Sequence, residues 1–130
     1  MIENVRPKKF LGQHFLIDEN ISKKIVEAVN LKEFDKIVEI GPGKGALSKY
    51  LFDFSDKLIL IEYDTESVEF IKSSFKKHNP NIVKKDFLKY NLKDVLTQTS
   101  KNLIIGNFPY NISSQIIFKI LENYLLVGNL

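Results

Sequence analysis

Apolar residues form four short runs along the chain, and the segments between them carry apolar residues at helical spacing. Such runs are typical of buried strands, which we expect at 36–40, 58–64, 82–85 and 103–106. The helical spacing predicts helices at 19–30, 45–52, 65–77 and 113–124, with a short helix or turn at 92–96. The run at 58–64 is apolar on both faces, as in a central parallel strand. This alternation predicts an α/β fold, a Rossmann-like, doubly wound parallel sheet.

The composition narrows the class of protein. With 130 residues, 44% of them hydrophobic, the chain can bury the core of one globular domain. The absence of cysteine excludes disulfides and thiolate metal sites, and with two histidines we expect no metal centre. No apolar run reaches the roughly 20 residues of a membrane span, and the N-terminus lacks a signal-peptide core, so we expect a cytoplasmic protein without a membrane partner. A net charge of +3 allows a nucleic-acid partner without requiring one.

A glycine-rich turn follows the first expected strand. Gly41, Gly43 and Gly45 connect that strand to the expected helix at 45–52. Glycines let the backbone approach a ligand closely, and the N–H groups of a helix start would face that ligand. The turn therefore predicts a site for a nucleotide-like cofactor, the alternative being a plain tight turn between strand and helix.

Two carboxylates end the next strands. Glu62 lies about 20 residues after the first glycine, where dinucleotide folds place the acid that binds the ribose hydroxyls. The alternative is a solvent-facing strand end. Asp86 follows the third strand beside Phe87 and could accept a hydrogen bond from an adenine amino group while the ring is packed. Its alternative role is to begin a loop as an Asx residue.

The fourth strand leads into Asn107-Phe108-Pro109-Tyr110. The Asn107 side-chain oxygen and the Phe108 carbonyl could hold the hydrogens of an adenine amine and free its lone pair, while Pro109 restricts the local geometry. Tyr110 offers a face on which the base can stack. The alternative is a turn with a purely conformational role. Because the ends of parallel strands share one edge, we expect the glycine turn, both carboxylates and Asn107 to lie together.

The segment 1–17 is basic and then aromatic. Arg6, Lys8 and Lys9 precede Phe10 and Phe15. Cations beside aromatic rings suit phosphate contact and base stacking. The alternative is a solvated tail whose aromatic residues pack on the core.

Together these motifs resemble those of the ribosomal RNA adenine N6-dimethyltransferases, class I enzymes that use S-adenosyl-L-methionine. The resemblance is carried by residues 11–16, 39–47, 61–64, 85–87 and 107–113. It implies that His14 and Leu16 border the cofactor, that Gly41 approaches its methionine part, and that Glu62 and Asp86 bind its ribose and adenine. The full cofactor site that it implies is His14, Leu16, Gly41, Gly43, Glu62, Asp86 and Asn107.

The resemblance also implies a target. Catalysis would fall to Asn107, Phe108, Pro109 and Tyr110. Phe108 stands where many members have leucine, which leaves its carbonyl in place. The substrate would be a pair of adjacent adenosines in small-subunit (16S) rRNA, within immature 30S subunits during ribosome biogenesis. The alternatives are a large-subunit rRNA methyltransferase of the macrolide-resistance type and an inactive RNA-binding module of ribosome assembly.

Members of this family are considerably longer than the present chain. They have further strands and a small C-terminal helical domain. We therefore expect residues 18–130 to form a partial cofactor-binding domain, with a sheet incomplete at its C-terminal side and without that helical domain. Two hypotheses follow. RNA methylation by this chain is weak or absent, and the apolar edge left at the fourth strand drives self-association.

Overall fold

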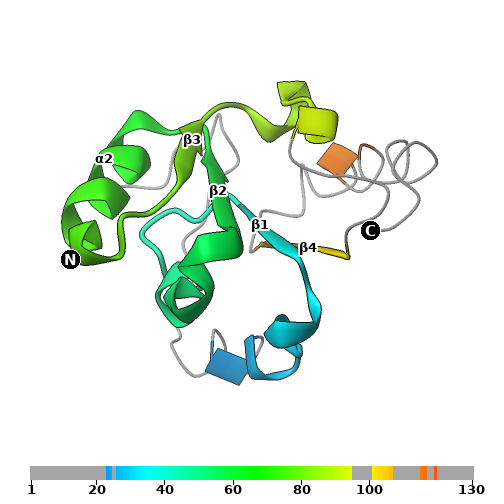
Figure 1. Cartoon of the computed structure of the whole chain (residues 1–130). Coiled ribbons are helices and arrows are strands. Elements are labelled where there is room, and N and C mark those ends of the chain that lie inside the picture. Colours follow the sequence, from blue (N-terminus) through cyan, green and yellow to red (C-terminus); the bar gives the residue numbers. More distant parts are fainter. Residues whose placement is uncertain (1–22, 25, 95–100, 107–114, 117–118, 120–130) are drawn as a thin grey trace.

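A parallel sheet forms the centre of the protein. The computed structural model describes residues 23–24, 26–94, 101–106, 115–116 and 119 (Figure 1). Within them, four strands pair in the order β3-β2-β1-β4, and each pair is parallel. The strands are β1 (Lys36–Ile40), β2 (Leu58–Glu62), β3 (Ile82–Lys84) and β4 (Asn102–Gly106). The predicted Rossmann-like parallel sheet is confirmed.

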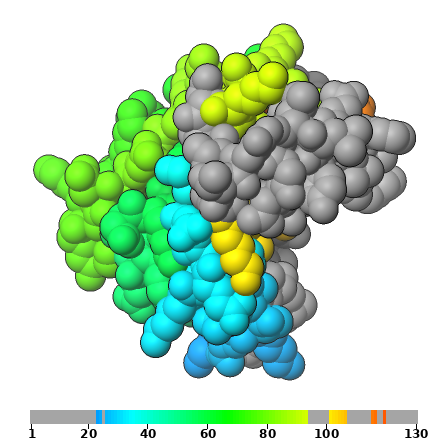
Figure 2. Space-filling model, turned by 45° about the vertical axis from the view of Figure 1, so that its right-hand side comes forward, coloured from blue at the N-terminus to red at the C-terminus, as the bar shows by residue number. Residues whose placement is uncertain are grey.

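The strand order reverses between β1 and β4. The chain runs outward from β1 to β2 and β3, and β4 then pairs with the opposite side of β1. Ile40 pairs with both Ile61 and Gly106, so the carboxyl ends of these strands lie level. In Figure 2, the atoms of β4 (yellow) lie against the cyan segment that contains β1. In open α/β sheets, ligands bind at the carboxyl ends of the strands, where the order reverses.

Both faces of the sheet are covered by apolar side chains. Alternate residues of each strand point to opposite faces. Ile37, Leu58 and Leu60 belong to one buried cluster, and Val38 and Ile61 to another. The prediction that the second strand is apolar on both faces is therefore confirmed. It also explains why β2 lies inside the sheet, with a neighbouring strand on each side.

Helix α2 (Thr65–Ser74) follows β2 and lies beside β3 (Figure 1). Asp64 caps its start, because its Oδ2 accepts hydrogen bonds from the Ser67 backbone N–H and hydroxyl, both at 3.0 Å. β2 ends at Glu62, as predicted, two residues before this cap. The helix ends three residues short of the expected 77, and a 3₁₀ turn, Lys76–His78, takes over.

The predicted helix over 45–52 is wrong. The chain turns through 43–47 and then forms two 3₁₀ helices, Ser48–Tyr50 and Phe52–Lys57. The cause lies in the turn, where Gly43 and Gly45 have φ values of 56° and 84°, outside the helical region. Since no α-helix starts here, the expected row of ligand-facing helix N–H groups is not formed.

The outer helices are described only in part. Residues 23, 24, 26 and 27 are helical and the chain turns at Ala28, two residues before the expected end. Residues 115, 116 and 119 are helical, as the pattern over 113–124 predicts. A 3₁₀ turn, Leu92–Asp94, agrees with the predicted short helix or turn. Among the helices described, none is long and apolar enough to cross a membrane.

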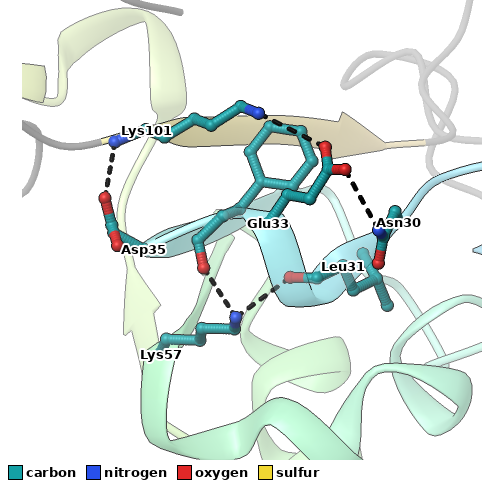
Figure 3. Close-up of polar contacts among 7 residues, drawn as sticks. Asn30, Leu31, Glu33, Asp35, Lys57 and Lys101 are labelled. Carbon is teal, nitrogen blue, oxygen red and sulfur yellow. Dashed lines mark hydrogen bonds and ion pairs between the residues drawn. The ribbon is translucent and has the colours of Figure 1, made fainter.

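A polar cluster joins the amino ends of β1 and β4, opposite the glycine turn (Figure 3). The Lys101 N–H donates to Asp35 at 2.8 Å, and its ammonium group pairs with Glu33 at 3.3 Å. The Lys57 ammonium group donates to the carbonyls of Leu31 at 2.9 Å and Phe34 at 2.6 Å. These contacts fasten the loop that precedes β1 to its neighbours.

Candidate functional site

The glycine turn leaves β1 at the point where the strand order reverses. The Gly41 N–H donates to the Ile61 carbonyl at 2.9 Å, which holds the start of the turn against β2. Gly41 has a φ of 65°, and a β-carbon added there would meet no atom of the described residues within 4 Å. By contrast, a β-carbon on Gly45 would lie 2.7 Å from the Phe75 ring. Gly41 therefore borders open space, whereas Gly45 is needed for packing.

Glu62 is a buried carboxylate that fastens the glycine turn. Its side chain is 2% exposed, so the alternative of a solvent-facing strand end is wrong. Oε1 accepts the Gly43 N–H at 3.0 Å and Oε2 accepts the Asp64 N–H at 2.9 Å. Burial raises the pKa of Glu62, an effect that these two N–H groups oppose.

Glu39 is a second buried acid, which the sequence reasoning did not select. Its side chain is 1% exposed, and its Oε1 accepts the Ser48 hydroxyl at 2.6 Å. Burial raises the pKa of Glu39 to about 8; the Ser48 hydrogen bond opposes this and the Glu62 charge adds to it. Glu39 is therefore mostly protonated at neutral pH. A glutamate within an apolar strand was the available signal.

Asp86 lies one strand further along the same edge. Its Oδ1 accepts the Leu88 N–H at 3.0 Å and caps the 3₁₀ helix Phe87–Lys89, which is the geometry of the Asx alternative. Within the described residues, no donor forms a hydrogen bond with its Oδ2. Phe87 is 5% exposed and belongs to the core, so little of its ring is open to a ligand.

The structure brings Gly41, Gly43 and Glu62 together, with Asp86 on the neighbouring strand end. The remaining predicted site residues lie outside the described residues, namely His14, Leu16, Asn107, Phe108, Pro109 and Tyr110. The segment 1–17 lies outside as well. What the structure does give is the end of β4 at Gly106, paired with Ile40, immediately before Asn107 in the chain.

Tyr63 was also not selected from the sequence. It follows Glu62 directly and is 52% exposed, the one large apolar side chain so exposed among the described residues. An exposed aromatic face beside a buried acid suits the stacking of a planar ring.

In the part of the chain that the structure describes, no three histidine, aspartate or glutamate side chains gather as metal ligands would.

The chain is similar in sequence to known proteins. The family model described as ribosomal RNA adenine dimethylase matches residues 4–128. The chain is 51% identical over 121 residues to a ribosomal RNA small subunit methyltransferase A from Flavobacterium johnsoniae, an alignment that covers 93% of this chain and 46% of the relative. The chain thus spans about half the length of the curated relatives it matches.

Solved structures agree with the fold. A dimethyladenosine transferase from Plasmodium falciparum superposes with a TM-score of 0.68 at 28% identity, over 84% of this chain and 38% of that one. The 23S rRNA methyltransferase ErmE superposes with a TM-score of 0.67 at 26% identity, over 81% of this chain and 41% of that one. The sheet described above is therefore the Rossmann-like fold of class I methyltransferases.

Proposed function

Because the chain belongs to the ribosomal RNA adenine dimethylase family, we propose that it is the cofactor-binding part of an rRNA adenine N6-dimethyltransferase that uses S-adenosyl-L-methionine. The proposed substrate is small-subunit rRNA in immature 30S subunits, in the cytoplasm. One observation carries the proposal: the glycine turn, buried Glu62 and the end of β4 meet where the strand order reverses.

The described residues fit such a cofactor. No atom of the described residues lies within 4 Å of a β-carbon added at Gly41, which leaves room there for the methionine part of the ligand, and the Glu62 carboxylate beside the same turn suits the ribose hydroxyls. The Oδ2 of Asp86, which no donor among the described residues contacts, suits an adenine amino group. Gly43 holds Glu62 in place, and His14 and Leu16 would border the ligand from the segment 1–17. S-adenosyl-L-methionine would supply a methyl group bound to a sulfonium.

The residues after β4 would hold the target base. The Asn107 side-chain oxygen and the Phe108 carbonyl would accept the two hydrogens of the adenine amine, and Pro109 would restrict the position of that carbonyl. Tyr110 would stack on the ring. Holding both hydrogens draws the amine lone pair out of conjugation and towards the methyl group. Catalysis would then come from positioning, and solvent would take the proton.

Calorimetric titration tests the cofactor part of the proposal. We expect this chain to bind S-adenosyl-L-methionine and not NAD. Binding of NAD instead would indicate a dinucleotide-dependent oxidoreductase and overturn the proposal.

Methyl transfer to isolated ribosomal subunits tests the target. We expect any transfer to occur on immature small subunits and to be weak, because the chain spans 46% of its relative. Preferred methylation of large-subunit rRNA would favour the macrolide-resistance branch. Cofactor binding without transfer to either subunit would favour an RNA-binding assembly module. Full turnover by this chain would contradict the expectation of weak activity.

We further propose that β4 mediates self-association. Among the residues that the structure describes, β4 pairs with β1 alone. An unpaired strand edge is a template for pairing with another chain. Light scattering at increasing concentration tests this, and a strictly monomeric species at the highest concentration would refute it.

A further inference from the structure

The loop that begins at Asp86 is held by a lysine from a distant segment. Lys119, a helical residue beyond β4, donates its ammonium N–H groups to the carbonyls of Phe87 and Tyr90. Its nitrogen also lies 4.8 Å from the centre of the Phe87 ring. One side chain thus contacts both ends of the short 3₁₀ helix Phe87–Lys89.

The Phe87 carbonyl already accepts the Tyr90 N–H at 3.1 Å, so Lys119 adds a second hydrogen bond there and a further donor at the Tyr90 carbonyl. A 3₁₀ helix leaves carbonyls without partners at its C-terminal end, and a charged donor there forms a strong hydrogen bond. At the other end, Asp86 supplies the cap for the Leu88 N–H. The cap and the lysine together fix the position of the loop relative to β3.

The helical residues beyond β4 also pack beneath this loop. Ile116 is 1% exposed and belongs to the same apolar cluster as Phe87 and Leu92. Ile116 and Lys119 are three residues apart, so they lie on the same face of a helix. Burial lowers the pKa of Lys119, and the Asp86 charge opposes that effect, so the ammonium also interacts with Asp86 electrostatically.

We propose that Lys119 is a positioning residue, which clamps residues 87–90 so that the Oδ2 of Asp86 faces the cofactor's adenine and selects for its amino group. The inference rests on the proposed function. Lys119 does not touch the ligand. It acts through Asp86, and its removal leaves the carboxylate present but no longer held at a hydrogen-bonding distance.

Purine selectivity tests this role. S-adenosylhomocysteine and its inosine analogue differ at the purine 6-position, where an amino group is replaced by a carbonyl. Calorimetric titration of this chain should show about tenfold tighter binding of the adenine compound, the value of one good hydrogen bond. Lys119→Met should weaken that binding and bring the ratio of the two affinities close to one. Lys119→Arg, which keeps charged donors, should retain most of the ratio.

Lys89→Met is the matched control, since it removes an exposed lysine from the same 3₁₀ helix. It should behave as the wild type. A general loss of stability would weaken both ligands equally, so the ratio reports positioning alone. Should Lys119→Met not fold, Lys119→Gln gives the same reading, because its shorter, uncharged side chain cannot bridge both carbonyls.

The outcomes separate the two proposals. A wild-type chain that binds neither compound overturns the proposed function. A wild-type chain that binds both compounds equally, or a folded Met or Gln variant that keeps the wild-type ratio, overturns the role of Lys119 and leaves cofactor binding intact.

Discussion

The backbone N–H of Gly43 donates a hydrogen bond to Oε1 of Glu62, 3.0 Å away and 19 positions along the chain. The other oxygen of Glu62 accepts the Asp64 N–H at 2.9 Å. One buried carboxylate therefore holds both the turn after β1 and the cap of α2. The proposed ribose acceptor is positioned by backbone groups, which keep it ordered before a ligand arrives.

Replacing Glu62 tests this arrangement. In Glu62→Gln one oxygen becomes an NH₂ group, so either the Gly43 or the Asp64 N–H faces a donor instead of an acceptor. We expect a loss of about 1–3 kcal/mol in the free energy of unfolding, the cost of one unsatisfied buried group. Affinity for S-adenosyl-L-methionine should fall about 10- to 100-fold, since hydrogen bonds to a charged acceptor are the stronger ones. Denaturant unfolding and calorimetric titration measure the two effects.

The exposed acid Glu69 provides the comparison for this variant. Glu69→Gln should leave both quantities within error of the wild type. A Glu62→Gln protein with unchanged cofactor affinity would argue against a ribose-binding role, whatever its stability.

Two glycines of the same turn should respond differently to alanine. Gly45→Ala places a β-carbon 2.7 Å from the Phe75 ring at a φ of 84°, so we expect a loss of about 1–3 kcal/mol in stability from overpacking, with backbone strain in addition. Gly41→Ala meets no atom within 4 Å and carries only the cost of its positive φ, about 1–2 kcal/mol.

Cofactor affinity should separate the two variants further. The methyl group of Gly41→Ala enters the space proposed for the methionine part, so we expect titration to show a large loss of affinity. The folded fraction of Gly45→Ala should bind nearly as the wild type does. Equal cofactor affinities for wild type and Gly41→Ala would place the ligand elsewhere.

The strands were predictable because their signal is local. Parallel strands buried on both faces form continuous apolar runs, and β1 began and ended where its run did. The cap of α2 was not predicted, since a local apolar run does not show that the Asp64 side chain accepts the Ser67 N–H. The prediction of a helix over 45–52 was wrong for a related reason. Apolar spacing suggested it, but positive φ angles at Gly43 and Gly45 prevented it.

The site was predictable where position along the chain determines position in space. Glu62 follows from the end of a strand and its distance from Gly41. The role of Glu39 depends on the chain bringing Ser48 back to the strand. The role of Lys119 depends on its contacts with Phe87 and Tyr90, which lie 32 and 29 positions earlier in the chain. No pattern within one segment contains that information, because both depend on tertiary packing.

Lys57 should contribute measurably to stability at the end of the sheet away from the site. Its ammonium group donates to the Leu31 carbonyl, as Figure 3 shows, and to the Phe34 carbonyl. Lys57→Met keeps most of the side-chain volume but removes both donors. We expect a loss of about 1–3 kcal/mol in the free energy of unfolding and no change in cofactor affinity. Lys32→Met, at an exposed position nearby, is the control, and an equally small effect of both variants would refute the prediction.

Glu39 should make stability depend on pH. Its pKa is about 8 in the folded chain against an ordinary value of 4.5, so the folded state holds a proton that the unfolded state releases. Its stabilising contribution is therefore complete below pH 4.5 and is lost as the pH rises towards 8. Within that range, stability should fall by up to about 1.4 kcal/mol per pH unit from this group.

Glu39→Gln removes this dependence, because an amide does not ionise and its oxygen can still accept the Ser48 hydroxyl. Thermal or denaturant unfolding from pH 5 to 8 should show that the stability of the variant increases relative to that of the wild type as the pH rises. The raised pKa of Glu62 contributes the same sign in both proteins, so the difference between their curves reports Glu39 together with its coupling to Glu62. Parallel stability curves across this range would mean that Glu39 is ionised in the folded chain, and that the Ser48 hydroxyl stabilises a carboxylate rather than an acid.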